Sequence, residues 1–449
     1  MLAKVKPLIP ARIRCRIFGH INELPVELLA EIFLFCLPTC TFTTTSRHVA
    51  PILFGRVCRV WRSVSLNTPQ LWAKVTLGRG KWYYSTDPPL GWITEFESTG
   101  IHEWLRRSGN FPLSFEIVAH TDPGTHHTDK GLGTRALRAQ AHRWKVVSLR
   151  GNCKCIDRIL KVLCTAGKTP RLTDIRFLNM RTFESDKPIP CAPQIRSLHL
   201  TLKDNPFLID GRFHALRDLR IGWCSSQLYP LIFMQFPLLE ILEITYSACS
   251  PPFGTATVVH TLPHLHTFIF ADHPPSIHFW LLDLFDTPAL NSLAISIWKV
   301  GGRFCERTRI SNFLIRCGSQ LQRLKLGGYS VSHDDINDFI QHTPILKSLC
   351  IEHATLTGDV TTLCSPLVQI NILITRSGLR GTLELVDDII SQWKNCGLKT
   401  LASITSSYSI RVPYYHLPKV LRQKKVKKYI QQGFRICYEE ESWWDTHVD

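Results

Sequence analysis

The sequence predicts an α/β protein in which a small all-α segment precedes a solenoid, a curved parallel sheet with helices on its outer side. Three observations predict this fold. Apolar residues recur at helical spacing between residues 21 and 72, and the motif L-x-x-L-x-L then recurs at intervals of 21 to 31 residues. Several of these intervals carry a helical pattern, and strands that alternate with helices at so short a period are expected to be parallel.

The first expected helix lies within residues 21–38, which read "INELPVELLAEIFLFCLP". Its apolar residues follow helical spacing at Leu24, Leu28, Leu29, Ile32, Phe33 and Phe35. Pro25 stands just inside the start and Pro38 just past the end. A helix of this length is stabilised mainly by packing of its apolar stripe, so it requires a partner.

A second helical stretch follows a Thr/Ser-rich loop at residues 39–51. Its apolar residues are again at helical spacing: Ile52, Leu53, Val57, Val60, Trp61 and Val64. Asn67, Thr68 and Pro69 interrupt the pattern before Leu71 and Trp72 begin a last apolar piece. The two stretches together are near the lower size limit for independent folding.

Strand-like segments with the recurring motif make up most of the rest of the chain. Their first apolar residues are Trp144, Leu172, Ile195, Leu216, Leu239, Leu265, Leu290, Leu321 and Leu346. One strand in each unit of this length is the sequence pattern of a solenoid. Weaker strand patterns follow at residues 365–375 and 397–405.

Helical patterns occupy several intervals between these strands. They lie at residues 155–164, 276–285, 332–340 and 384–397. An irregular helix–strand unit at residues 100–120 is expected to precede the repeats. These patterns predict helices on the outer side of the sheet.

The composition bounds the location and the possible partners. The 449 residues include 53 Lys and Arg against 36 Asp and Glu, a net charge of +17 that is spread along the chain rather than gathered in blocks. This spread disfavours nucleic acid as the partner. The 16 cysteines include no Cys-x-x-Cys pair, and we identify no secretory signal or membrane-length apolar run. We therefore expect buried thiols in the cytoplasm, the nucleus or both, and no membrane contact.

Residues 20–75 resemble the F-box, in the form frequent in large fungal families. The residues that carry the resemblance are Leu24, Pro25, Glu27, Leu28, Glu31, Ile32, Phe33, Val57, Cys58, Trp61, Arg62, Pro69, Leu71 and Trp72. The segments after it resemble irregular leucine-rich repeats. Such repeats usually hold Asn or Cys three positions after the third leucine, where Asn152 and Cys224 fit. The other repeats depart from this pattern with Met180, Lys203, Ser247, His273, Trp298 and Tyr329, so we expect irregular loops.

The resemblance implies that the helices bind a Skp-family adaptor and thereby a cullin–RING ubiquitin ligase. The positions implied near that contact are Leu24, Pro25, Leu28, Ile32, Val57, Cys58, Trp61 and Leu71. A small helical segment with more apolar surface than its own core can cover is consistent with an outside partner. The Thr-rich insert at residues 39–51 departs from the family by lengthening the loop between the helices.

The strand positions between the leucines are expected to face the concave side, where solenoids bind partners. The polar residues there are Asp174, Arg176, His199, Asp218, Arg220, Glu243, Arg323, Lys325 and Glu352. Their charges have mixed signs, whereas a phosphate-binding surface carries one sign. We interpret this face as the binding surface for a client protein of unknown identity, with an ordinary solvated sheet face as the alternative.

The expected organisation therefore has five parts. They are a basic tail (1–19), the F-box (20–77), a connecting region (78–142), the solenoid (143–410) and a basic, then acidic, C-terminal tail (411–449). The first part also has the composition of a weak transit peptide, although its prolines favour a plain tail. The run "RQKKVKKY" in the last part is either a nuclear localisation signal or a solvated helix face.

Other motifs do not indicate catalysis. His120, Asp122, His126, His127 and Asp129 are metal-ligand types, but no second cluster completes a four-ligand site, so a surface loop is the preferred interpretation. No P-loop or G-x-S-x-G motif occurs, and "GLGTRAL" contains only the first part of a dinucleotide fingerprint. We expect no enzyme activity, no catalytic residue, no metal and no cofactor.

The leading hypothesis is a non-enzymatic adaptor that holds a client close to a ubiquitin ligase, because two sites on one body raise effective concentration. Two alternatives remain open. One is an F-box interaction protein that acts without ubiquitination, and the other is a basic solenoid that binds nucleic acid.

Overall fold

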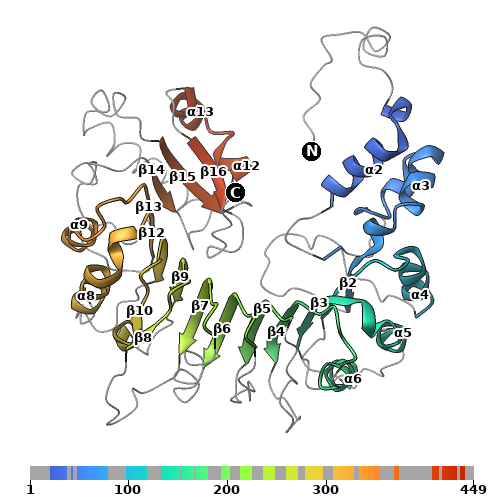
Figure 1. Ribbon diagram of the computed structural model, residues 1–449. Helices are drawn as coiled ribbons and strands as arrows, with labels where there is room; N and C mark the ends of the chain where they lie inside the picture. The colour runs from blue at the N-terminus through green and yellow to red at the C-terminus, as the bar shows by residue number, and fades with distance from the viewer. Residues whose placement is uncertain are drawn as a thin grey trace, which may run out of the picture. The chain divides into compact units, whose positions relative to one another are not determined.

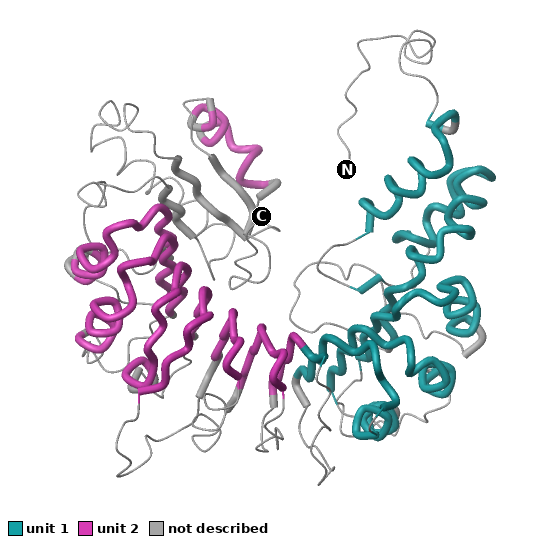
Figure 2. Tube along the Cα trace, in the orientation of Figure 1, with its two compact units in different colours: residues 1–195, 208–210 teal, residues 196–207, 211–449 magenta. Residues whose placement is uncertain are grey.

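The chain is a mixed α/β protein that forms two compact units (Figure 1; Figure 2). Unit 1 comprises residues 1–195 and 208–210, and unit 2 comprises residues 196–207 and 211–449. The computed structural model describes residues 21–37, 42–43, 48–78, 98–118, 133–151, 154–165, 167–180, 194–202, 213–224, 236–247, 259–271, 279–296, 307–327, 333–352, 369–373, 407–413, 417–431 and 435–439.

The N-terminal helices of unit 1 lie where the apolar spacing predicts them. They are η1 (Ile21–Glu23), α2 (Val26–Phe35), η2 (Phe54–Arg56), α3 (Arg59–Leu66) and η3 (Pro69–Trp72). Pro25 is the N-cap of α2 rather than its first helical residue. Cys58 caps α3, where its Sγ atom accepts a hydrogen bond from the Trp61 N–H at 3.5 Å. The break expected at residues 67–69 separates α3 from η3.

A parallel sheet follows directly from these helices. Its strands, in order, are β1 (Lys74–Gly78), β2 (Leu113–Val118), β3 (Trp144–Arg150) and β4 (Asp174–Met180). Strand β1 was not predicted, and it joins the end of the expected F-box to the sheet by pairing with β2. On its other side the Thr76 N–H donates to the carbonyl of Thr43, at 2.9 Å, so a residue of the insert covers the edge of β1.

The helices of unit 1 pack on the apolar face of this sheet. They are α4 (Ser98–Arg107), α5 (Thr134–Ala139), η4 (Ala141–Arg143) and α6 (Lys154–Leu163). The apolar side chains of α6 expected on one face are all buried: Ile156, Ile159, Leu160 and Leu163. Trp144 of β3 donates from Nε1 to the carbonyl of Leu137 at 3.1 Å, which fixes α5 on the sheet.

The buried guanidinium of Arg143 joins η4 to the segment between α4 and β2. It donates to the Ser108 hydroxyl at 2.8 Å and to the Phe111 carbonyl at 2.9 Å. Burial, together with the nearby charge of Arg171, lowers the pKa of Arg143 from its usual value, because desolvation disfavours the charged form. These bonds compensate the buried charge and hold α4 and α5 in place.

Unit 2 holds a longer sheet in which each strand pairs in parallel with the next. Its strands, in order, are β5 (Ser197–Leu202), β6 (Asp218–Cys224), β7 (Ile241–Ser247), β9 (Thr267–Ala271), β11 (Ser292–Ser296), β12 (Arg323–Gly327), β13 (Ser348–Glu352), β14 (Gln369–Leu373), β15 (Ser407–Pro413) and β16 (Arg435–Glu439). A separate pair joins β8 (His260–Thr261) to β10 (Phe285–Asp286). The nine strongest strand predictions, one in each L-x-x-L-x-L segment, are all confirmed.

The leucines of the repeat form continuous rows across unit 2. One row is Leu198, Leu219, Leu242, Phe268, Leu293, Leu324 and Leu349, in register and at most 1% exposed. The leading apolar residue of each repeat is buried in a turn that directly precedes its strand. In one such turn the Leu216 N–H donates to the Phe213 carbonyl at 3.0 Å. This explains why the motif needs an apolar residue three positions ahead of the strand pair.

A shared carbonyl sets the register between successive repeats of unit 2. The N–H groups of Arg217 and Asp218 both donate to the carbonyl of Arg196, at 2.9 Å each. The same pair of hydrogen bonds to one carbonyl oxygen recurs at Arg217, Glu240, His266, Asn291 and Gln322. Each strand is therefore aligned with its neighbour at the point where it begins.

The helices of unit 2 agree with the predictions in part. They are η5 (Phe279–Leu284), α8 (Arg307–Cys317), η6 (Gly318–Gln320), α9 (His333–Gln341), α12 (Leu417–Val420) and α13 (Lys424–Gln431). The helix expected at residues 276–285 is a 3₁₀ segment that ends where β10 starts, and α8 was not predicted. Helix α8 packs on the leucine rows, with the Phe313 ring 6.1 Å from that of Phe268.

Several predictions concern residues outside those that the structure describes. They are the basic tail 1–19, the histidine cluster 120–129, the helix 384–397, the strand 397–405 and the acidic end of the C-terminal tail. The same holds for the side chains expected at the leucine-rich-repeat Asn position, from Asn152 to Tyr329.

Candidate protein-interaction sites

Helix α2 has two apolar stripes, and they lie in different environments. Leu29 and Phe33 are fully buried, and the Phe33 ring stacks on Phe54 at 4.2 Å. The stripe beside them, Leu28, Ile32 and Phe35, is 53%, 37% and 84% exposed. Because the spacing of i, i+4 and i+7 places these three side chains on one face, α2 presents an uncovered apolar stripe.

The segment around α3 adds to this uncovered surface. Val57 is 54% exposed and Val60 is 41% exposed. Trp61, next to Val60, is half-buried, with its ring 4.8 Å from Phe33 and 6.2 Å from Phe54. We call Leu28, Ile32, Phe35, Val57 and Val60 the exposed apolar set. Isolated apolar side chains are common on protein surfaces, but five on α2 and on the segment around α3 are typical of an interaction site.

The structure places the eight predicted adaptor-binding residues in three environments. Leu24, Pro25, Leu28, Ile32 and Val57 are exposed, and Cys58 and Trp61 are half-buried. Leu71 is fully buried in η3 and does not reach the surface. Phe35 and Val60 are exposed residues that the adaptor-contact prediction omitted, although both belong to its apolar patterns.

The residues next to Leu71 bind the helices to the rest of unit 1. The Trp72 ring lies 4.9 Å from Trp104 of α4, and its Nε1 atom donates to the Ser65 carbonyl at 2.8 Å. The guanidinium of Arg107 lies over the same ring at 4.5 Å. Together with the β1–β2 pairing, these contacts make the N-terminal helices an integral part of unit 1.

The second predicted site divides into three parts. On β6 and β7, Arg220 lies 3.2 Å from Asp218 and 3.4 Å from Glu243, measured between charged N and O atoms. The Ser197 hydroxyl also donates to Asp218, at 3.3 Å, and His199 is the register neighbour of Arg220. These polar residues form one cluster, which we call the Arg220 cluster.

Arg323 and Lys325 lie on β12, apart from this cluster. Strands β9 and β11 intervene, and at the register position of Glu243 they carry Ile269 and Ala294. Both of these side chains are buried. The polar residues of unit 2 on this face are therefore divided into two groups, because the strands between them carry apolar residues at that position. Burial lowers the pKa of Arg323.

Asp174 and Arg176 belong to β4 of unit 1. Arg176 is in register with Ser148, Glu116 and Thr76, and Asp174 is in register with Val146. Glu116 accepts a hydrogen bond from Ser148 at 3.2 Å and lies 3.9 Å from the Arg150 guanidinium. Asp174 accepts from the hydroxyl of Thr173. The side chain of Glu352 lies outside those that the structure describes.

Two features are absent from the described residues. These residues contain no helix that is both long and apolar enough to span a bilayer. They also contain no group of three His, Cys, Asp or Glu side chains arranged around a common metal position. The chain matches no model of a known protein family and no curated protein.

Proposed function

We propose that this chain is the substrate-recognition adaptor of a cullin–RING ubiquitin ligase. In this proposal the N-terminal helices are an F-box that binds a Skp-family adaptor, and the parallel strands form an irregular leucine-rich-repeat solenoid that holds a client. The observation that carries the proposal is the exposed apolar set, which lies within the segment that resembles the F-box. The chain itself is not an enzyme, and other subunits transfer ubiquitin.

The physical reason is the cost of leaving this apolar surface in water. Removing apolar area from water contributes roughly 25 cal/mol per Å². A protein partner would cover Leu28, Ile32 and Val57 together, and aromatic Phe35 is a side chain of the type that anchors interface cores. The carboxylates of Glu27 and Glu31 and the guanidinium of Arg59, all exposed, supply a charged rim.

The client is proposed to bind the polar face of the strands. The Arg220 cluster offers both signs of charge within one small area, which suits a protein surface better than a phosphate backbone. Arg323 and Lys325 supply a second, basic contact point on β12. A chain with these two functions acts by proximity in the cytoplasm or the nucleus.

The test is the substitution Leu28→Asp in the full-length chain, with binding to a purified Skp-family adaptor measured by calorimetry. A charge placed in an apolar interface should weaken binding more than about tenfold, since an unpaired buried charge costs several kcal/mol. The matched control is Ile315→Asp, an equally exposed apolar residue on α8 of unit 2. The melting temperature of both variants should stay close to that of the parent.

Full adaptor affinity in the Leu28→Asp variant would show that the F-box assignment is wrong. Two other measurements separate the alternatives. Accumulation of a co-purified client when this protein is depleted favours ubiquitination over binding alone. A steep loss of RNA or DNA binding with rising salt would favour the nucleic-acid alternative.

A further inference from the structure

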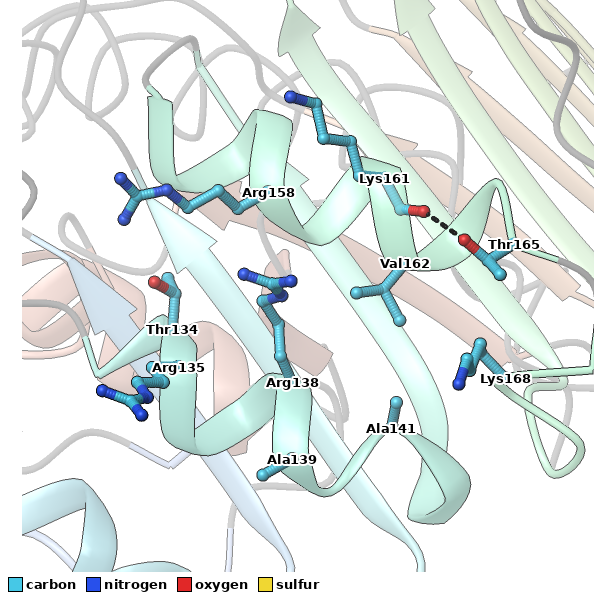
Figure 3. A pocket seen from close by; sticks show the side chains of 10 residues that line it. All are labelled: Thr134, Arg135, Arg138, Ala139, Ala141, Arg158, Lys161, Val162, Thr165 and Lys168. Atoms are coloured by element: carbon cyan, nitrogen blue, oxygen red, sulfur yellow. Dashed lines mark hydrogen bonds between the residues drawn. The ribbon is translucent and has the colours of Figure 1, made fainter.

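A groove between α5 and α6 of unit 1 is not used by the proposed function. Its volume is about 660 Å³, and it is lined by residues of both helices and of the turns that follow them (Figure 3). Five basic residues line it: Arg135, Arg138, Arg158, Lys161 and Lys168. We call this the α5–α6 groove.

Two basic residues of each helix line the groove. Arg135 and Arg138 are three residues apart on α5, and Arg158 and Lys161 are three apart on α6. Figure 3 shows the Arg138 guanidinium pointing from α5 toward α6. Since residues at i and i+3 lie on the same side of a helix, each helix contributes one charged edge.

The apolar sides of the same helices hold these edges in place. Leu137 of α5 and Ile159 of α6 are fully buried, and the Trp144 indole donates to the Leu137 carbonyl at 3.1 Å. Gly133, which begins α5, has a φ of +58° and lies against Ile101 of α4. The basic side chains are therefore mounted on a rigid base, so little backbone ordering is needed when a ligand binds.

The described residues that line the groove carry charge of one sign. Five of them are basic and none is acidic. Basic side chains gathered around one hollow create a positive potential that attracts anions.

We propose that the α5–α6 groove binds a small anion that carries two or more phosphate groups. Pockets for small ligands typically measure roughly 300–1,000 Å³, so one phosphate ion would leave most of this groove empty. Three guanidinium groups supply the paired donors that phosphate oxygens accept best. The compact hollow favours a discrete anion over an extended nucleic acid, whose contacts would follow a basic stripe. This inference does not depend on the F-box, because the groove and the exposed apolar set share no residue.

The test is calorimetry of the full chain with inorganic tripolyphosphate, and with inorganic phosphate for comparison. We expect saturable binding of tripolyphosphate that weakens as NaCl is added, and much weaker binding of phosphate. The double variant Arg138→Gln/Arg158→Gln should lose at least about tenfold in affinity, since it removes two charged hydrogen-bond donors from the groove. The control Arg59→Gln/Lys145→Gln removes two exposed charges of unit 1 outside the groove and should keep full affinity.

A second arm identifies the source of the phosphates. Vesicles of phosphatidylcholine with phosphatidylinositol bisphosphate are compared with the free inositol phosphate headgroup. Equal competition by headgroup and vesicle indicates a free ligand, whereas stronger binding to the vesicle indicates a lipid. Either result supports the proposal when the groove variant abolishes the binding. Equal loss in both double variants, no saturable binding, or duplex RNA binding that tripolyphosphate fails to displace would overturn it.

Discussion

The N-terminal helices and the strands of unit 2 use the same apolar residue types in different ways. In unit 2 the row that contains Leu219 and Leu242 is fully buried, because each strand is covered by its neighbours and by helices such as α8. In α2, Leu29 is buried while the adjacent Leu28 is more than half exposed. A repeated strand closes its core within the chain, whereas a pair of short helices covers only one of its two apolar stripes. The uncovered stripe is where a second protein can bind.

The largest effect is expected from Phe33→Ala, compared with Phe35→Ala on the same helix. Phe33 is fully buried between Phe54 and Trp61, so its truncation should lower the free energy of unfolding by about 3–5 kcal/mol. Phe35 is the most exposed of the set, and its truncation should change stability by less than about 0.5 kcal/mol. Chemical denaturation measures both values.

This pair also separates folding from binding. Phe35→Ala should weaken adaptor binding although it leaves stability unchanged. Equal destabilisation by both substitutions would contradict the division of α2 into a buried and an exposed stripe. Trp61→Ala should fall between them, because the Trp61 side chain is only half-buried.

A smaller effect is expected from Gly133→Ala, with Gly167→Ala as its matched control. Both glycines have positive φ, +58° and +76°, which costs other residues roughly 1–2 kcal/mol. A methyl group at Gly133 would also lie 2.2 Å from Ile101 Cγ2, whereas nothing lies within 4 Å at Gly167. Gly133→Ala should therefore destabilise unit 1 by about 1–2 kcal/mol more than the control. Equal melting temperatures would show that α4 and α5 move apart freely.

Arg220→Gln should have a moderate effect on unit 2. Its loss leaves Asp218 and Glu243 without the cation between them, and all three side chains are less than a quarter exposed. We expect a destabilisation of about 1–2 kcal/mol and weaker client binding. Arg217→Gln is the control, because its ion pair with Glu240 is largely exposed and should contribute less than about 0.5 kcal/mol. A larger loss from the control would exclude the Arg220 cluster as a structural element.

The smallest effect concerns Glu103 on α4. Hydrogen bonds from Arg106 and Arg107 lower the pKa of Glu103 from 4.5 to about 2. Because the pKa is lower in the folded state, the stabilisation is present above pH 4.5 and is lost as the pH falls toward 2. Solvent screens this exposed group, so the contribution should stay below about 1 kcal/mol. The stability difference between the parent and Glu103→Gln, measured from pH 7 to pH 2, should decrease in that window and remain flat above it.

The sequence predicts the strands better than it predicts which side chains face outward. Each L-x-x-L-x-L segment contains a strand because its last two leucines follow the two-residue period of a strand. Its leading residue is buried in the turn before that strand. By contrast, Leu28 and Leu71 have the same chemistry, and nothing in the spacing shows that Leu28 is exposed and Leu71 buried. That outcome depends on how α2, η3 and α4 pack.

Contacts between distant segments were also beyond the reach of the pattern. Strand β1 is five residues long and follows a helix directly, so its alternation was too short to detect. Helix α8 carries many charged and polar residues and gave no clear apolar stripe. The basic groove combines residues of two helices some twenty positions apart, which only the folded chain brings together.

The pair of hydrogen bonds to one carbonyl lets the connecting segments of unit 2 change in length during evolution. It fixes six strands of unit 2 at their first residues, regardless of how the chain arrives there: β6, β7, β9, β11, β12 and β13. The successive leading residues are 21 to 31 positions apart, yet their strands remain in register. Lengthening a connection adds only a small entropic cost. The segments between strands can therefore gain or lose residues while the sheet that carries them stays the same. Such changes can create a new recognition surface.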